Sequence, residues 1–188
     1  MNPDILRWDE KYGAANAPDF VESDELLQTH AGLLAGEGRA LDVACGAGAN
    51  AIYVASRGYT TFGVDGSLKG LRLAARRARA CGTTLHLINA DLDRYRPPPE
   101  AFDLVLVFRY LNRPLFDALE LTLRPRGLII LKTFNRNLLN TKPGFNPDYL
   151  LEPGELPRRF GSLEQIATND DGGNQDTFSW WIGRKPAT

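Results

Sequence analysis

The sequence predicts an α/β fold with a mostly parallel sheet and helices on both faces. Short apolar runs, such as RALDVA at 39–44 and FDLVLVF at 102–108, suit strands that are buried on both sides. They alternate with segments of helical pattern, which is the arrangement of parallel α/β proteins. The 188 residues suit one domain, predicted here as residues 1–188.

The first half of the chain supplies the clearest elements. Residues 1–35 are expected to form a helical N-terminal segment with a hinge at 13–20, followed by a core at 36–188. Gly58 ends a predicted helix, and a second helix begins at Ser67 as its N-cap and ends before Gly82. The strands expected beside them lie at 39–44, 59–65 and 84–91.

The second half is expected to begin with two more strands, at 102–108 and 124–134, which flank a short helix at 114–123. The alternation of strand and helix ends after them. A proline-rich loop at 92–101 precedes these strands. A short helix is expected at 153–160, and β-like runs at 162–168 and 177–185 are joined by the polar turn NDDGGNQD. The turn predicts a C-terminal antiparallel hairpin that closes one edge of a seven-stranded sheet.

Composition excludes several classes of function. A formal net charge of −1 gives no broad attraction to nucleic acid or to an anionic membrane. No secretory pattern opens the chain, and no apolar run approaches the ~18 residues of a membrane span. Cys45 and Cys81 form no C-x-x-C pair, so a reducing cytoplasm is the expected compartment. The sequence has only two histidines, which argues against a histidine-rich metal site, and no metal is expected.

The stretch ALDVACGAGANA, residues 40–51, contains the pattern that carries most information. Gly46, Gly48 and Ala51 fit the G-x-G-x-x-G/A spacing of dinucleotide-binding turns, between a strand and a helix. The predicted fold is therefore Rossmann-like and doubly wound. Asp42 lies just upstream, where its negative charge would repel a bound pyrophosphate.

Carboxylates also end the following strands, because Asp65 closes the second and Asp91 the third. In open α/β sheets ligands bind outside the carboxyl ends of the strands, so Asp42, Asp65 and Asp91 are expected on one rim. S-adenosylmethionine suits this rim, since it carries an ammonium and a sulfonium and no phosphate. Asp42 is expected near the ammonium, Asp65 at the ribose hydroxyls and Asp91 at the adenine amino group.

The motifs LDVACGAGA, FGVDGS, NADL and LRPRGLIILKTF, in this order, resemble those of class I S-adenosylmethionine-dependent methyltransferases. The resemblance covers nearly the whole chain and implies that S-adenosyl-L-homocysteine is the product. It implies cofactor-binding roles for Asp42, Ala44, Gly46, Gly48, Asp65, Gly66, Asp91 and Leu92. Ala44 departs from the family pattern, which often has glycine there, at little expected cost. Ser67 and Phe108, beside these motifs, complete the predicted cofactor set.

The segment RWDEKYG, followed by PDFV, resembles the N-terminal part of the tellurite and thiopurine methyltransferase-like branch. In that branch the segment closes over the cofactor. The resemblance implies that Trp8, Tyr12 and Phe20 lie near the methionine end. No counterpart of the branch's His-Arg pair occurs in ATNDDGGNQDTFSWW, so tellurite chemistry stays open.

The methyl acceptor is expected beside FRYLNRPLF, residues 108–116, which follows the fourth strand. Arg109, Tyr110 and Arg113 are the candidate catalytic residues, because they can orient an anionic or electron-rich acceptor. The alternative is that Arg109 and Arg113 pair with surface acids. A small molecule is the expected acceptor, and a soft anion such as a thiolate, selenite or tellurite needs no general base.

Three functions remain in competition at this point: a methyltransferase, a non-catalytic domain that binds S-adenosylmethionine, and a small NAD(P)-dependent reductase. Among other charged and aromatic residues, Arg72, Arg76 and Arg79 are expected on a solvated helix face rather than in a nucleic-acid patch. His86 is expected in or near the core, and Cys45 as a small buried filler. The sequence does not indicate the oligomeric state.

Overall fold

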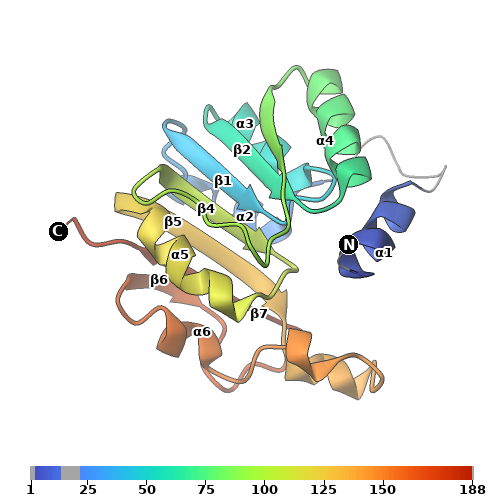
Figure 1. Ribbon diagram of the computed structural model, residues 1–188. Coiled ribbons are helices and arrows are strands. Elements are labelled where there is room, and N and C mark those ends of the chain that lie inside the picture. Colours follow the sequence, from blue (N-terminus) through green and yellow to red (C-terminus); the bar gives the residue numbers. More distant parts are fainter. Residues whose placement is uncertain (1–2, 14–21, 188) are drawn as a thin grey trace. The chain divides into compact units, whose positions relative to one another are not determined.

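The structure is a computed structural model that describes residues 3–13 and 22–187. The chain divides into two compact units, residues 1–95 and residues 96–188. The first unit holds the glycine turn and the second holds the segment that follows the fourth strand (Figure 1). The predicted single domain with a helical segment at 1–35 stays a prediction.

The first unit is built on three parallel strands, β1 (Arg39–Val43), β2 (Thr60–Asp65) and β3 (Leu85–Asn89), with β2 in the middle. Helix α3 (Ala49–Ser56) connects β1 to β2, and α4 (Leu68–Ala80) connects β2 to β3. The N-terminal segment contributes α1 (Pro3–Tyr12), α2 (Glu25–Thr29) and the 3-10 turn η1 (Ala31–Leu33).

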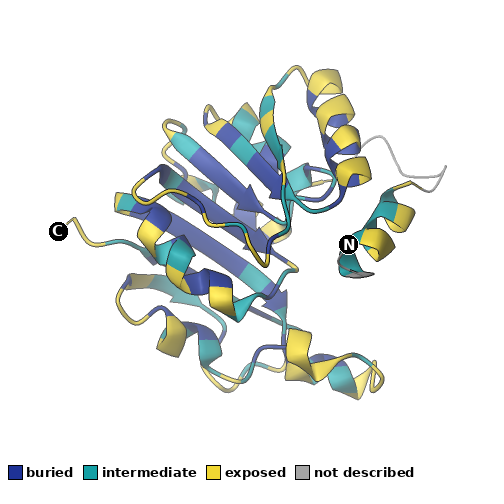
Figure 2. Ribbon diagram, viewed as in Figure 1, coloured by how far each residue is buried: buried dark blue, intermediate teal, exposed yellow. Residues whose placement is uncertain are grey.

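Local signals set the ends of α4 as the sequence predicts. The Ser67 hydroxyl accepts the Gly70 N–H at 3.0 Å, which satisfies one of the free donors of the first turn. Gly82 follows the helix with φ +68°, a conformation that glycine adopts at low cost. The outer face of α4 is exposed, and β1 is largely buried (Figure 2).

The second unit contains the parallel pair β4 (Phe102–Phe108) and β5 (Leu123–Phe134). The antiparallel strands β7 (Phe178–Arg184) and β6 (Glu164–Thr168) continue from β5, as the hairpin prediction requires. The second unit also contains the helical elements η2 (Arg113–Leu115), α5 (Phe116–Thr122), η3 (Arg136–Asn140), η4 (Pro147–Tyr149) and α6 (Glu155–Arg159). Phe160 stacks on Trp181 with ring centroids 5.2 Å apart, and both are buried in its core.

The strand order of the seven-stranded sheet is β3-β2-β1-β4-β5-β7-β6. Strand pairs are parallel from β3 to β1 and between β4 and β5, and antiparallel from β5 to β6. This order and these directions confirm the predicted Rossmann-like, mostly parallel sheet with a C-terminal antiparallel hairpin.

One side chain on the sheet, His86, differs from expectation, and one on α4, Arg77, was not assigned to a helix face in advance. His86 was expected in or near the core and is exposed, because β3 is an edge strand; it stacks on Phe62 at 4.8 Å. Arg72, Arg76 and Arg79 are exposed as predicted. Arg77, between them in sequence, is 5% exposed and lies on the inner face of the helix.

Candidate active site

The glycine turn between β1 and α3 adopts a backbone that favours glycine at three positions. Ala44, Gly46 and Gly48 have φ of +57°, +52° and +81°. The two glycines adopt this left-handed region freely, whereas Ala44 pays about 1 kcal/mol there. The substitution of alanine for glycine at position 44 therefore has a larger cost in this structure than the sequence suggests.

Asp42 lies in β1 beneath this turn and is 2% exposed. Burial, followed by the nearby charge of Asp65, raises the pKa of Asp42 to about 8, and a hydrogen bond from the Ala51 N–H opposes the shift. The carboxyl is therefore buried, as is most of β1, the strand that the sequence predicts to be covered on both faces; its place beside a cofactor stays a prediction. It is two residues from Ala44 and still adjoins the turn.

The Asp65 carboxylate ties the turn to the end of β2. Its Oδ2 accepts the Gly46 N–H at 2.8 Å, and its Oδ1 accepts the Ser67 N–H at 2.7 Å. Burial raises the pKa of Asp65, while these two hydrogen bonds lower it. Asp65 thus orients both the glycine turn and Ser67, the N-cap residue of α4. Its predicted contact with a ribose remains a proposal.

Helix α1 packs over the β2–α4 loop through side chains that the sequence analysis did not single out. Asp9 accepts hydrogen bonds from the Ser67 hydroxyl and from the Lys69 N–H, and these bonds lower its pKa. Ile5 lies against Gly66, where an added Cβ would come within 2.8 Å of it. A single aspartate in a helix gives no pattern, so the sequence carried no signal for Asp9.

Tyr12, at the end of α1, reaches the glycine turn. A Cβ added at Gly46 would lie 2.2 Å from the Tyr12 hydroxyl, and one at Gly70 would lie 3.0 Å from its ring. Trp8 stacks on Tyr12 with ring centroids 5.6 Å apart. Of the three predicted aromatic residues, Tyr12 therefore lies at this turn, Trp8 stacks behind it on Tyr12, and Phe20 lies outside the described residues.

Asp91 and Leu92 follow β3. The Asp91 Oδ1 accepts the Asp93 N–H at 3.1 Å, which is a local turn contact, and Leu92 is buried. Asn89 was not predicted, and its side-chain amide donates to the carbonyls of Asp65 and Gly66 at 3.0 and 2.9 Å. These bonds fix the backbone of the loop that carries Gly66.

In the second unit, the residues after β4 form a compact turn. Phe108 is buried, whereas Arg109 is exposed and has φ +57°, with its N–H bonded to the Lys132 carbonyl at 2.8 Å. The Tyr110 hydroxyl accepts the Asn112 side-chain amide at 3.0 Å. A positive φ on an arginine is strained, and such strain is common at functional positions.

Arg113 makes a set of structural contacts in the same unit. Its guanidinium pairs with both carboxylate oxygens of Glu155, at 2.6 and 2.9 Å, and donates to the carbonyls of Asp148 and Leu150. The Glu155 hydrogen bond raises the pKa of Arg113. These contacts favour the ion-pair alternative over an acceptor-binding role.

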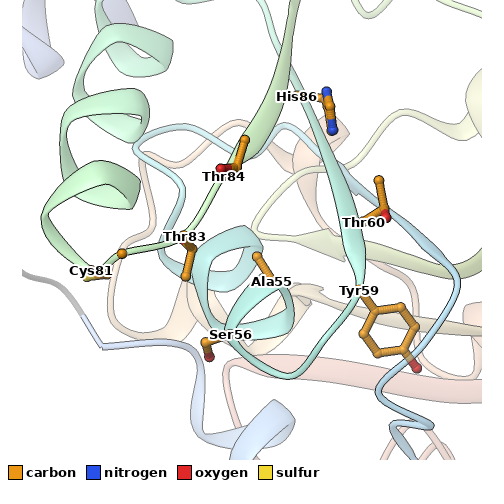
Figure 3. A pocket seen from close by; sticks show the side chains of 9 residues that line it. Ala55, Ser56, Tyr59, Thr60, Cys81, Thr83, Thr84 and His86 are labelled. Carbon is orange, nitrogen blue, oxygen red and sulfur yellow. The ribbon is translucent and has the colours of Figure 1, made fainter.

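A hollow in the first unit lies at the other end of the strands from the glycine turn. It is open, measures about 570 Å³ and is lined at the amino ends of β2 and β3 by Thr60, Thr84 and His86 (Figure 3). Ligands of open α/β sheets bind at the carboxyl ends, so this hollow is not the candidate active site. In residues 3–13 and 22–187 no group of three His, Cys, Asp or Glu side chains can hold a metal.

Residues 40–127, which span β1 to β5 and include the glycine turn, match the family model described as a methyltransferase domain. These residues, slightly less than half of the chain, are thus similar to a methyltransferase domain. The match supports the resemblance to class I methyltransferases, whereas the tellurite and thiopurine branch stays a prediction. No helix in the described part of the chain has the length and apolarity that crossing a membrane requires.

The proteins to which this chain is similar include ubiquinone biosynthesis O-methyltransferases. Those from Rhizobium etli and Agrobacterium fabrum are 30% and 32% identical over 105 residues, which are 53% of this chain and 42% of each relative. The matched region thus spans less than half of the length of these relatives. A SAM-dependent methyltransferase from Methanosarcina mazei has the same fold, with a TM-score of 0.70, 17% identity and coverage of 89% and 100% of the two chains.

Proposed function

We propose that the chain transfers a methyl group from S-adenosylmethionine to a small-molecule acceptor. The observation that carries the proposal is the buried Asp42 carboxyl beneath the glycine turn, 2% exposed, with a pKa raised to about 8 by burial and by Asp65. A cationic ligand beside this pair offsets the cost of ionising Asp42, and an anionic ligand increases it. The family match at residues 40–127 supports the same assignment.

The residues of the first unit fit such a cofactor. Glycines at 46 and 48 let the turn adopt its left-handed backbone close to Tyr12 and Ala74, and Asp65 keeps further acceptor lone pairs for ribose hydroxyls. Asp42 balances the positive charge, and Gly66, Asp91 and Leu92 flank the same strand ends. When bound, S-adenosylmethionine supplies a methyl group that its sulfonium already activates for displacement.

A pyrophosphate cofactor fits this turn less well. Arg77 is close to the turn, but the residue is only 5% exposed, and its guanidinium donates to the Ala47 carbonyl at 3.2 Å. It therefore contributes to the turn itself, and it offers a phosphate little accessible surface. A dianionic pyrophosphate would be repelled by the Asp65 carboxylate and would further oppose ionisation of Asp42.

The chain's own part in the reaction is to bind, orient and exclude water, because an activated donor needs little further chemistry. Tyr12 on α1 lies against the glycine turn, and with Trp8 stacked on it can keep water from the methyl group. Arg109 and Tyr110, after β4, are the proposed acceptor-orienting residues. We assign Arg113 a structural role, because its guanidinium donates hydrogen bonds to residues of the loop at 148–155.

The acceptor class divides into two cases. The relatives named ubiquinone biosynthesis O-methyltransferases favour a hydroxyl acceptor, which benefits from a general base. The resemblance of the N-terminal segment favours a soft anion, a thiolate or a selenite- or tellurite-type oxyanion, which needs none. We propose a hydroxyl of low pKa, such as a phenol, as the first acceptor to test, because it ionises with little help.

A screen of acceptors tests the proposal. Phenols, catechols, thiols, selenite and tellurite are each incubated with the purified chain and S-adenosylmethionine, and release of S-adenosylhomocysteine is measured. Acceptor-dependent release that is lost in Asp65→Ala and kept in Asp171→Ala, an exposed turn residue, supports methyl transfer. Tight cofactor binding without release for any acceptor contradicts it and supports a non-catalytic binding domain.

A further inference from the structure

Arg77 is an arginine buried inside the first unit. It belongs to α4, which lies beside β2 and β3 (Figure 1), and it is 5% exposed, whereas its neighbours Arg76 and Arg79 are exposed. Burial of a guanidinium is costly unless the group is hydrogen-bonded, so a buried arginine has a specific structural role. One of its donors, Nη1, lies 3.2 Å from the Ala47 carbonyl oxygen.

The carbonyl that Arg77 contacts belongs to the centre of the glycine turn. Ala47 lies between Gly46 and Gly48, whose φ values of +52° and +81° place it in an irregular backbone. Gly48 is the N-cap of α3, and the first helical bond of that end is accepted by the Gly48 carbonyl from Ile52. The Ala47 carbonyl precedes the helix and needs a donor from elsewhere, which Arg77 provides.

Two other residues on the same face of α4 also lie along the turn. A Cβ added at Gly48 would be 2.8 Å from the Ala74 Cβ, and one added at Gly70 would be 3.3 Å from the Gly46 carbonyl oxygen. Positions 70, 74 and 77 are spaced i, i+4 and i+7, which brings them to one helix face. Helix α4 therefore packs against the turn with two small residues and bonds to it with one long cationic side chain.

We propose that Arg77 is a positioning residue of the cofactor loop. It acts through the Ala47 carbonyl and holds the peptide units around Gly46 and Gly48 in the orientation that the ligand meets. The inference rests on the proposed function, because it assigns the cofactor to this turn. The role differs from that of Asp65, the last residue of β2, whose carboxylate accepts the Gly46 N–H.

The expected consequence is a loss of preorganisation. Without the guanidinium, the Ala47 carbonyl loses a charge-assisted hydrogen bond and the turn samples other backbone orientations. A ligand must then order the turn as it binds, which weakens its affinity. We expect the dissociation constant for S-adenosylhomocysteine to rise about tenfold in Arg77→Met, the change that loss of one such bond predicts.

Calorimetry and amide exchange on one set of variants test this role. The set is the wild type, Arg77→Met, Arg77→Lys, the exposed control Arg79→Met, and Ile130→Val, which loses a buried methylene in β5 of the second unit. Titration with S-adenosylhomocysteine, well below the unfolding temperature, gives each dissociation constant. Hydrogen exchange of the peptide covering 44–49 reports on the turn without any ligand.

We expect the dissociation constant to be lowest for the wild type, higher for Arg77→Lys and highest for Arg77→Met. Lysine can still donate to a carbonyl, but with poorer geometry. Exchange at 44–49 should rise in the same order, and both controls should match the wild type in affinity. Arg77→Met with reduced stability but wild-type affinity and exchange overturns the proposal. If that variant does not fold, wild-type behaviour of Arg77→Lys in both measurements overturns it.

The two readouts separate this inference from the proposed function. A wild-type chain that shows no heat with S-adenosylhomocysteine refutes the proposed function and, with it, the cofactor part of this inference. Exchange at 44–49 then decides whether Arg77 orders the turn: faster exchange in Arg77→Met upholds the structural link, and unchanged exchange overturns it.

Discussion

The Tyr12 hydroxyl lies against the backbone of Gly46, so closely that a Cβ at position 46 would be 2.2 Å from it. The Gly46 N–H is bonded at the same point to the Asp65 carboxylate. Three elements, α1, the turn after β1 and the end of β2, thus converge on one glycine. Any ligand that approaches Gly46 from the side of α1 meets Tyr12.

Gly46→Ala is expected to destabilise the protein by about 2–3 kcal/mol, because a left-handed φ and a steric overlap with Tyr12 both act against alanine. In a Tyr12→Ala background the overlap disappears, and the penalty should fall to about 1–2 kcal/mol. Urea unfolding of the four proteins measures the difference. Equal penalties in the two backgrounds would show that Tyr12 does not rest on Gly46 in solution.

Asp42→Asn is expected to remove a pH dependence of stability. The folded protein keeps a proton on Asp42 up to its pKa of about 8, whereas the unfolded chain releases it near pH 4. Wild-type stability should therefore fall as pH rises between these values, by about 1.4 kcal/mol per pH unit for each proton retained. Asparagine does not titrate, so the variant should be more stable than the wild type at pH 8.

Urea unfolding between pH 5 and 9 checks this expectation. The exposed Asp93→Asn serves as the matched control and should follow the wild type. Parallel curves for the wild type and Asp42→Asn would mean that the Asp42 carboxyl is already ionised in the folded protein.

Asp65→Ala should weaken binding of S-adenosylmethionine by about 1–3 kcal/mol, since it removes the predicted ribose contacts and frees the Gly46 N–H. The same change should lower folding stability, because the Gly46 and Ser67 amides lose their acceptor. Calorimetry and thermal unfolding measure the two effects. Unchanged affinity at reduced stability would restrict Asp65 to a structural role.

Arg113→Ala is expected to act on stability rather than on turnover. The guanidinium holds Glu155 and two carbonyls of the loop at 148–155, so its loss should cost about 1–2 kcal/mol. Arg136→Ala breaks an exposed pair with Glu152 and should change stability little. Full stability of Arg113→Ala together with lost turnover would restore the arginine to the acceptor site.

Local and periodic signals made the fold predictable. The ends of α4 followed from Ser67 and Gly82, and the hairpin followed from its polar turn. His86 was misjudged because sequence does not tell an edge strand from a central one. The burial of β1 around Asp42 agrees with the prediction of a strand covered on both sides, because its neighbours in RALDVA are apolar.

Long-range contacts at the candidate site were beyond sequence analysis. Asp9 bonds to Ser67, 58 residues away, and Arg77 bonds to Ala47, 30 residues away. Neither pair forms a motif, because the contacts arise when α1 and α4 pack on the turn. Arg77 in particular lies on the buried face of α4 between exposed arginines, and its position on the helix does not identify the Ala47 carbonyl as its partner.

Calorimetric titration of the purified chain with S-adenosylhomocysteine and with NAD(P) tests the central claim most directly. The account predicts saturable one-to-one binding of S-adenosylhomocysteine that weakens in Asp65→Ala, and no comparable heat with NAD(P). Tight NAD(P) binding with no response to S-adenosylhomocysteine would contradict it.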